Sequence, residues 1–166
     1  MRADLGLKGK TALVTGSASG IGEAIARRLA AEGARVIIHG PVSRNDEAEK
    51  VAREIRDAGG EAHVELAELT DAAECARLVA AGIARMGRLD ILVNNAGISP
   101  RGDLLATDAE FFDRVIAVNL RAPLLLIRAA LPHFREHGGG RVLNIGSKTP
   151  TAARRGCSPT RSAKAG

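Results

Sequence analysis

The sequence predicts one three-layer α/β/α domain built on a doubly wound parallel sheet, and three observations lead to this fold class. Short, continuous apolar runs alternate with amphipathic segments, which is the pattern of parallel strands covered by helices on both faces. The length of 166 residues fits one domain, and a hydrophobic content of 45% is typical of a globular chain. A glycine-rich turn joins the first apolar run to the first amphipathic segment.

The predicted elements follow one another as strand and helix along the whole chain. Strands are expected at residues 11–15, 35–39, 63–67, 89–93 and 141–145, and helices at about 21–31, 45–58, 71–86 and 108–137. Glycines mark several of the ends; Gly33, for example, stands where a helix C-cap favours glycine. Because the carboxyl ends of parallel strands meet at one rim, we expect residues 15–22, 94–97 and 146–147 to lie together.

The glycine-rich turn, residues 15–22, has the spacing Gly-x-x-x-Gly-x-Gly. Gly16 can adopt backbone angles closed to other residues, and Gly20 and Gly22 allow close approach of a ligand and of the strand. The unpaired N–H groups of the following helix would then face any anion above the turn, which suits a pyrophosphate. The alternative is a turn that joins a strand to a helix and binds nothing.

Composition argues against several other classes of function. The net charge of +5 comes from dispersed arginines, and the chain has no Trp and no Tyr, so a nucleic-acid-binding protein is the weakest of the three interpretations considered. Cys75 and Cys157 have no metal or redox spacing. There is no apolar leader, and arginines interrupt the longest apolar run, so we expect a soluble cytoplasmic protein without membrane contact. The four histidines match no motif and are expected on the surface or in packing roles.

Four motifs together resemble the short-chain dehydrogenase/reductase family, and most of all its 3-oxoacyl-carrier-protein reductases. They are the glycine-rich turn, Asn-Asn-Ala-Gly at 94–97, Asn119 within Val-Asn-Leu, and Asn-Ile-Gly-Ser at 144–147. The resemblance covers essentially the whole chain, with the motifs in the family's order. It implies a Rossmann-type sheet, an NAD or NADP cofactor, and hydride transfer between nicotinamide and a small carbonyl or alcohol substrate. It also implies pairing of the long helix between subunits, hence a homo-oligomer.

The resemblance also implies roles for individual residues. The expected cofactor-binding residues are Gly16, Ser17, Ser19, Gly20, Ile21, Gly22, Glu68, Leu69, Asn95, Ala96, Gly97 and Lys164. Glu68 stands where the family usually has Asp near the adenine. Ser147 would hydrogen-bond the substrate oxygen, and Lys164 would bind the nicotinamide ribose and lower the pKa of a neighbouring hydroxyl. Asn119 would hold a water in the proton relay.

Pro123 supports the role of Asn119 independently of the family. It lies four residues after Asn119 and has no N–H, so it cannot donate the helical hydrogen bond to the carbonyl of Asn119. That carbonyl would be free to hold a water, and the helix should bend there. A kink that serves packing alone is the alternative.

Residues 40–44 bear on the choice of cofactor. NAD-preferring relatives usually carry Asp at the end of the second strand, where this chain has Gly40, so nothing there repels a 2′-phosphate. Pro41 replaces the arginine that NADP users often have next, but Arg44 is near enough to reach the same site. The sequence therefore favours NADP over NAD.

Two departures from the family bear on activity. The family's Tyr-x-x-x-Lys motif places a tyrosine thirteen residues after the serine, and this chain has Thr160 there, with Lys164 in place. We therefore expect little or no dehydrogenase activity; an inactive dinucleotide-binding protein that acts through partners is the alternative to an enzyme.

The second departure is length, because relatives continue beyond this motif and the sequence ends at Gly166. We therefore expect the C-terminal strands to be missing and the strand at 141–145 to have an unpaired edge. We also expect the chain to self-associate.

Overall fold

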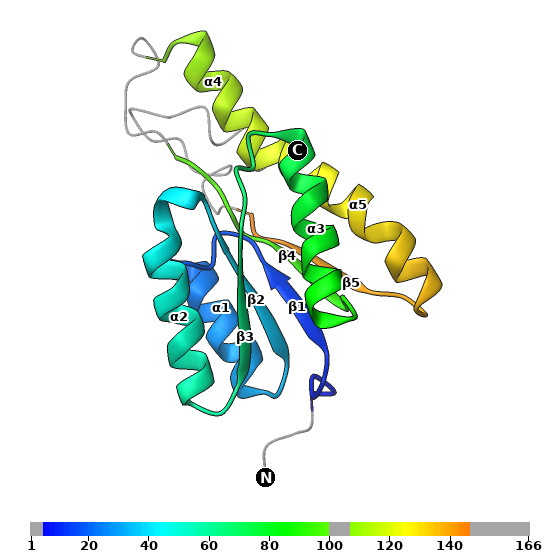
Figure 1. The fold of residues 1–166 in the computed structure, drawn as a ribbon. Helices are drawn as coiled ribbons and strands as arrows, with labels where there is room; N and C mark the ends of the chain where they lie inside the picture. The colour runs from blue at the N-terminus through cyan, green and yellow to red at the C-terminus, as the bar shows by residue number, and fades with distance from the viewer. Residues whose placement is uncertain (1–4, 100–106, 147–166) are drawn as a thin grey trace.

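The computed structural model describes residues 5–99 and 107–146, and they form a five-stranded parallel sheet with helices on both faces (Figure 1). The strands are β1 (Thr11–Val14), β2 (Arg35–Gly40), β3 (Glu61–Leu66), β4 (Ile91–Asn94) and β5 (Arg141–Asn144). They lie in the order β3-β2-β1-β4-β5, and each neighbouring pair is parallel. β1 is therefore central, and the strand order reverses direction beside it.

Helices cover the two faces of the sheet in pairs. On one face they are α1 (Gly20–Ala31) and α2 (Asn45–Asp57), and on the other α3 (Ala72–Met86) and α5 (Ala122–Glu136). The helix α4 (Ala109–Ile116) extends beyond the sheet, and a short 3₁₀ helix η1 (Val42–Arg44) precedes α2. Successive side chains of a strand point to opposite faces. In β1, Ala12 and Val14 accordingly pack in the cluster that includes α1 and α2, while Leu13 packs in the cluster that includes α3 and α5. Figure 1 shows these two layers on either side of the strands.

The predicted fold class is confirmed, and most element boundaries agree to within two residues. The difference lies in the predicted helix at 108–137, which is three segments: α4, a π-helical turn at Ala117–Arg121, and α5. Pro123 lies at the start of α5, directly after the π-helical turn. The missing N–H of Pro123 thus coincides with a local widening of the helix. Such π-helical turns are rare in proteins as a whole, but those that occur are often found at functional sites.

The segment Ala109–Glu136 is long and apolar enough, by length and composition alone, to cross a membrane, and 39% of its most apolar stretch is buried. A core helix of a globular protein meets the same criterion. The exposed large apolar side chains of this segment are those of Phe112, Leu120, Leu124 and Leu131.

β5 is an edge strand of the sheet that the described residues form, as expected. Its Val142 and Leu143 side chains are 39% and 46% exposed.

Candidate functional site

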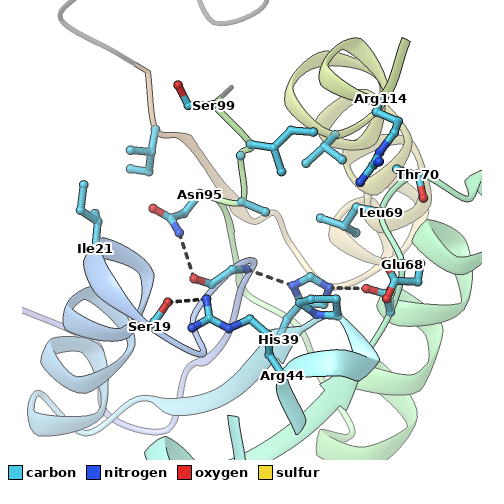
Figure 2. Close-up of a pocket in the computed structure, with 18 of the residues that line it drawn as sticks. Ser19, Ile21, His39, Arg44, Glu68, Leu69, Thr70, Asn95, Ser99 and Arg114 are labelled. Carbon is cyan, nitrogen blue, oxygen red and sulfur yellow. Dashed lines mark hydrogen bonds between the residues drawn. The ribbon is translucent and has the colours of Figure 1, made fainter. Parts of the chain in front are cut away.

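A cavity of about 810 Å³ lies at the carboxyl ends of the strands, where β1 separates the two halves of the sheet. Segments that follow all five strands line it: the glycine-rich turn after β1, the segment with η1 after β2, the loop between β3 and α3, the loop after β4, and residues 145–146 after β5. The lining residues predicted from the sequence are Gly16, Ser19, Ile21, Arg44, Glu68, Leu69, Asn95, Ala96 and Gly97. Figure 2 shows side chains from these loops converging on one space.

The glycines of the turn have different roles. Gly16 has a φ of 65°, and a Cβ on it would lie 2.9 Å from the Cα of Ala96. Gly20 also has a positive φ, 61°, with open space around the position of a Cβ. A Cβ on Gly22 would lie 2.3 Å from the carbonyl oxygen of Gly16 and 2.4 Å from Nδ2 of Asn95. Gly22 therefore allows the close packing of helix α1 against the turn.

Thr15 and Asn95 join the glycine-rich turn to the loop after β4. The Thr15 hydroxyl oxygen accepts hydrogen bonds from the N–H groups of Asn95 and Ala96, both at 3.0 Å, and donates to the Val93 carbonyl at 3.3 Å. The amide of Asn95 donates to the carbonyls of Thr15 at 2.9 Å and Gly16 at 3.3 Å. These two loops thus form one rigid floor under the cavity.

His39, at the end of β2, is a lining residue that the sequence did not identify. Its side chain is buried, and its Nδ1 accepts a hydrogen bond from the Gly16 N–H at 3.0 Å. The Nε2 lies 3.2 Å from the Ala67 carbonyl. Desolvation lowers the pKa of His39 from 6.5 to about 4, so the ring is neutral near pH 7. Of the two expected roles, surface or packing, the buried ring excludes the first, and its position at the cavity was not expected.

Ser17 differs from the expectation that it lines the pyrophosphate site. Its side chain is fully buried, and its hydroxyl donates to the Val14 carbonyl at 2.7 Å and accepts from the His39 N–H at 2.9 Å. The Ser17 N–H in turn donates to the His39 carbonyl at 2.8 Å. The residue therefore fastens the turn to β2, and its side chain does not line the cavity.

Arg44, from η1, reaches across the mouth of the cavity to the glycine-rich turn. Its Nη1 donates to the Ser19 hydroxyl at 2.9 Å, and its Nε lies 3.3 Å from Glu47 (Figure 2 shows the first of these bonds). Gly40 does not line the cavity, and a Cβ on it would lie 3.2 Å from the Cβ of Ala18. Glu68, from the loop after β3, lies beside the start of η1, where its Oε1 accepts from the Val42 N–H at 3.3 Å.

Asn119 lies in the π-helical turn and holds the loop after β4. Its Oδ1 accepts from the Ile98 N–H and its Nδ2 donates to the Ile98 carbonyl, both at 2.9 Å. The side chain is buried and does not line the cavity. The side chain of Asn119 is therefore occupied with positioning Ile98, which is a lining residue.

Several predicted residues lie elsewhere, and several lining residues were not predicted. Ser17, Gly20, Gly22, Gly40 and Asn119 support the cavity without lining it. Ser147, Thr160 and Lys164 lie outside the described residues. The lining residues that the sequence interpretation missed include His39, Pro41, Ala67, Thr70, Ile98, Arg114 and Val118. Most of them lie next to the end of a predicted strand, and this position in the sequence could have identified them as lining residues. Arg114 and Val118 lie on the long helix, and no feature of the sequence pointed to them. Within residues 5–99 and 107–146, no group of three or more His, Cys, Asp or Glu side chains is placed to hold a metal ion.

The parallel sheet, the glycine-rich turn and the cavity at the point where the strand order reverses define a Rossmann-type dinucleotide-binding fold. A family model described as short chain dehydrogenase matches residues 10–166, and the chain belongs to this family.

Relatives and solved structures agree with this assignment. The chain is 38% identical over 148 residues to an uncharacterized oxidoreductase of Thermotoga maritima, covering 87% of this chain and 56% of that protein. It is 41% identical over 139 residues to the granaticin polyketide synthase putative ketoacyl reductase 2 of Streptomyces violaceoruber, covering 82% of this chain and 54% of that protein. The chain thus spans about half the length of the curated relatives it matches.

Two similar crystal structures contain NADP. One is a metagenomic short-chain oxidoreductase with 37% identity and a TM-score of 0.88, covering 95% of this chain and 71% of that one. The other is a short chain dehydrogenase from Burkholderia cenocepacia, also with 37% identity and a TM-score of 0.88, covering 96% and 64%.

Proposed function

We propose that this chain forms the nicotinamide-dinucleotide-binding part of an oxidoreductase that moves a hydride between NADP or NAD and a small carbonyl or alcohol substrate. The observation that carries the proposal is the cavity built by the glycine-rich turn and by the loops after β3 and β4. Its volume of about 810 Å³ is in the range of small-molecule and cofactor sites. The N-terminus of α1 begins at Gly20 on one side of it, which suits a pyrophosphate.

The nicotinamide cofactor would supply the hydride, and the chain would bind and orient it. In this proposal the glycine-rich turn holds the pyrophosphate, and Glu68 and Leu69 flank the adenine. The Asn95 and Asn119 side chains hold the loop after β4 in place, through Gly16 and Ile98 respectively. Ser147 and Lys164 would act on the substrate oxygen and the nicotinamide ribose, as the family resemblance implies.

NADP is the preferred cofactor in this proposal, and the pair Arg44–Ser19 supports it. The guanidinium and the hydroxyl are hydrogen-bonded beside the end of β2, where Gly40 contributes no carboxylate. A 2′-phosphate there would find one cation and one hydroxyl donor, and charge-assisted hydrogen bonds to phosphate are strong. NADP is also the ligand of two similar solved structures.

Fluorescence titration with NADPH and NADH tests this function. We expect the wild-type chain to bind both, and Arg44→Ala to weaken NADPH about tenfold while changing NADH by less than about twofold, because only NADPH carries the phosphate. The matched control is Arg53→Ala, an exposed arginine on α2 that does not line the cavity. Absence of binding to either dinucleotide would contradict the proposed function, and equal losses for both would contradict the NADP preference.

A second function, dinucleotide binding without turnover, is favoured by one observation: Thr160 stands at the position of the family's tyrosine. Such a protein would act through partners. Turnover with a panel of carbonyl substrates separates the two functions, since both predict cofactor binding.

We further propose a cytoplasmic homo-oligomer that contacts neither nucleic acid nor membrane. The exposed Phe112, Leu120, Leu124 and Leu131 on the helical segment from α4 to α5 support a subunit contact. Light scattering should give a mass above that of the monomer, and Leu124→Glu should lower it. A sharp wild-type monomer with cooperative melting would contradict this proposal.

A further inference from the structure

The His39 side chain connects two loops that approach the cavity from different strands. Gly16 belongs to the glycine-rich turn after β1, and Ala67 immediately precedes Glu68 and Leu69 in the loop after β3. The imidazole lies between them, 3.0 Å from the Gly16 nitrogen and 3.2 Å from the Ala67 oxygen (Figure 2).

The two partners fix the protonation state of the ring. The Gly16 N–H can only donate, so Nδ1 must be unprotonated; the Ala67 carbonyl can only accept, so Nε2 must carry the hydrogen. One neutral tautomer satisfies both contacts. The ring is 2% exposed, and each of its two nitrogens has one backbone partner. The positive charge of Arg77 on α3 also disfavours the imidazolium.

We propose that His39 is a positioning residue for the adenosine half of the cofactor: its neutral Nε2–H tautomer sets the spacing between the glycine-rich turn and the loop that carries Glu68 and Leu69. The inference rests on the proposed function, because it assumes that these two loops bind the pyrophosphate and the adenine. His39 acts through the two loops and does not itself transfer a proton or hydride.

Two substitutions separate the two hydrogen bonds. In His39→Asn the amide oxygen can take the place of Nδ1 and accept from Gly16, whereas the contact to Ala67 is lost. In His39→Gln the amide nitrogen can take the place of Nε2 and donate to Ala67, whereas the Gly16 N–H is left unpaired. An unpaired buried N–H destabilises the conformation that contains it. The turn then populates its binding-competent form less often.

The test is titration of the 166-residue chain with NADPH, NADH and ADP, with the folded fraction of each variant taken from circular dichroism. We expect each single-contact variant to bind all three ligands at least about fivefold more weakly than wild type, and His39→Leu to bind more weakly than either. The factor should be the same for ADP as for the dinucleotides, because ADP carries only the adenosine half. The matched control is His63→Gln on β3, a histidine that does not line the cavity, which should bind like wild type.

A second measurement needs no variant and keeps the inference testable if the substitutions unfold the chain. Nitrogen-15 NMR of the wild-type chain should show the His39 ring still neutral at about pH 5.5, with the hydrogen on Nε2, because its pKa is lowered from 6.5 to about 4. A hydrogen on Nδ1 of His39, or wild-type affinity in His39→Leu, would overturn the inference. Failure of the wild-type chain to bind any dinucleotide would instead overturn the proposed function.

Discussion

The side chain of Asn119 and the backbone of Ile98 form a pair of hydrogen bonds, each 2.9 Å long, in which the amide both donates and accepts. They join the π-helical turn to the loop that follows β4. These bonds fix the orientation of the amide, and the side chain is buried and does not line the cavity. The backbone carbonyl of Asn119, which Pro123 leaves without its helical donor, is therefore the better placed group to hold a water in a proton relay.

Removal of this amide should loosen the loop after β4. Asn119→Ala leaves the N–H and the carbonyl of Ile98 unpaired, and we expect the free energy of unfolding to fall by about 2 kcal/mol. Urea denaturation measures it. Asn45→Ala, at the exposed start of α2, is the control, and an equal change in both variants would argue against this role of Asn119.

His39 should make stability depend on pH. Desolvation lowers its pKa from 6.5 to about 4, so between these values the unfolded chain binds more protons than the folded one. The stabilisation is complete above pH 6.5 and is lost as the pH falls toward 4, by about 3 kcal/mol. Urea melts of wild type and His39→Asn from pH 7 to 4.5 measure the difference. Parallel pH profiles of the two proteins would contradict the assignment.

Asp90 should stabilise the opposite end of the sheet. Burial acts to raise its pKa, but hydrogen bonds from the Thr11 N–H, Arg88 and Lys10 outweigh burial and hold the pKa below its usual value. Its contribution is thus present above the ordinary pKa of aspartate and is lost as the pH falls through the folded value. Asp90→Asn should lower the free energy of unfolding at pH 7 by about 2 kcal/mol. The exposed Asp57→Asn should change stability by less than about 0.5 kcal/mol.

Gly22→Ala should remove dinucleotide binding. The new Cβ would meet the Gly16 carbonyl at 2.3 Å, and backbone at that distance can yield only if the glycine-rich turn moves. Gly82→Ala on α3 is the matched comparison, since its Cβ would meet only the flexible end of Ile37, at 2.7 Å. We expect NADPH titration to detect no binding in the first variant and wild-type affinity in the second. Equal affinities would show that the turn tolerates a side chain.

Thr160 should limit turnover, although it lies outside the described residues. The family resemblance implies a tyrosine here that exchanges a proton with the substrate oxygen. An aliphatic hydroxyl ionises about 5 pKa units above a phenol, a difference of about 7 kcal/mol. We expect Thr160→Tyr to raise kcat/KM by several orders of magnitude with NADPH and a carbonyl panel. The comparison is best made in chimeras that continue with the C-terminal segment of a solved relative, and similar rates in the two chimeras would contradict it.

The fold could be predicted because its signals are local. Strand one, from Thr11, is a continuous apolar run, and glycines such as Gly33 end helices through their own backbone geometry. The π-helical turn was expected only as a bend, because the sequence shows that Pro123 lacks a donor but not how the helix accommodates the loss.

The site could be predicted only in part, for a related reason. Gly16, Asn95 and Ala96 belong to motifs with a fixed place beside strand ends, and they line the cavity. His39 and Arg114 belong to no such motif; their nearness to the cavity depends on strand order and helix packing, which bring together residues far apart in the chain. The Ser17 side chain likewise points into the protein because its hydroxyl accepts a hydrogen bond from the His39 N–H in β2.

The central position of β1 sets the order in which the molecule can assemble. One side of β1 pairs with β2, which follows closely in the chain, but the other side waits for β4, and the Thr15–Asn95 contacts span 80 residues. Contacts across such a separation form slowly, because a long loop must close before any of them is made. During synthesis or refolding, the N-terminal helices therefore form before the glycine-rich turn and the loop after β4 come together as the floor of the cavity. Competence to bind a dinucleotide is acquired late, in the same step that completes the centre of the sheet.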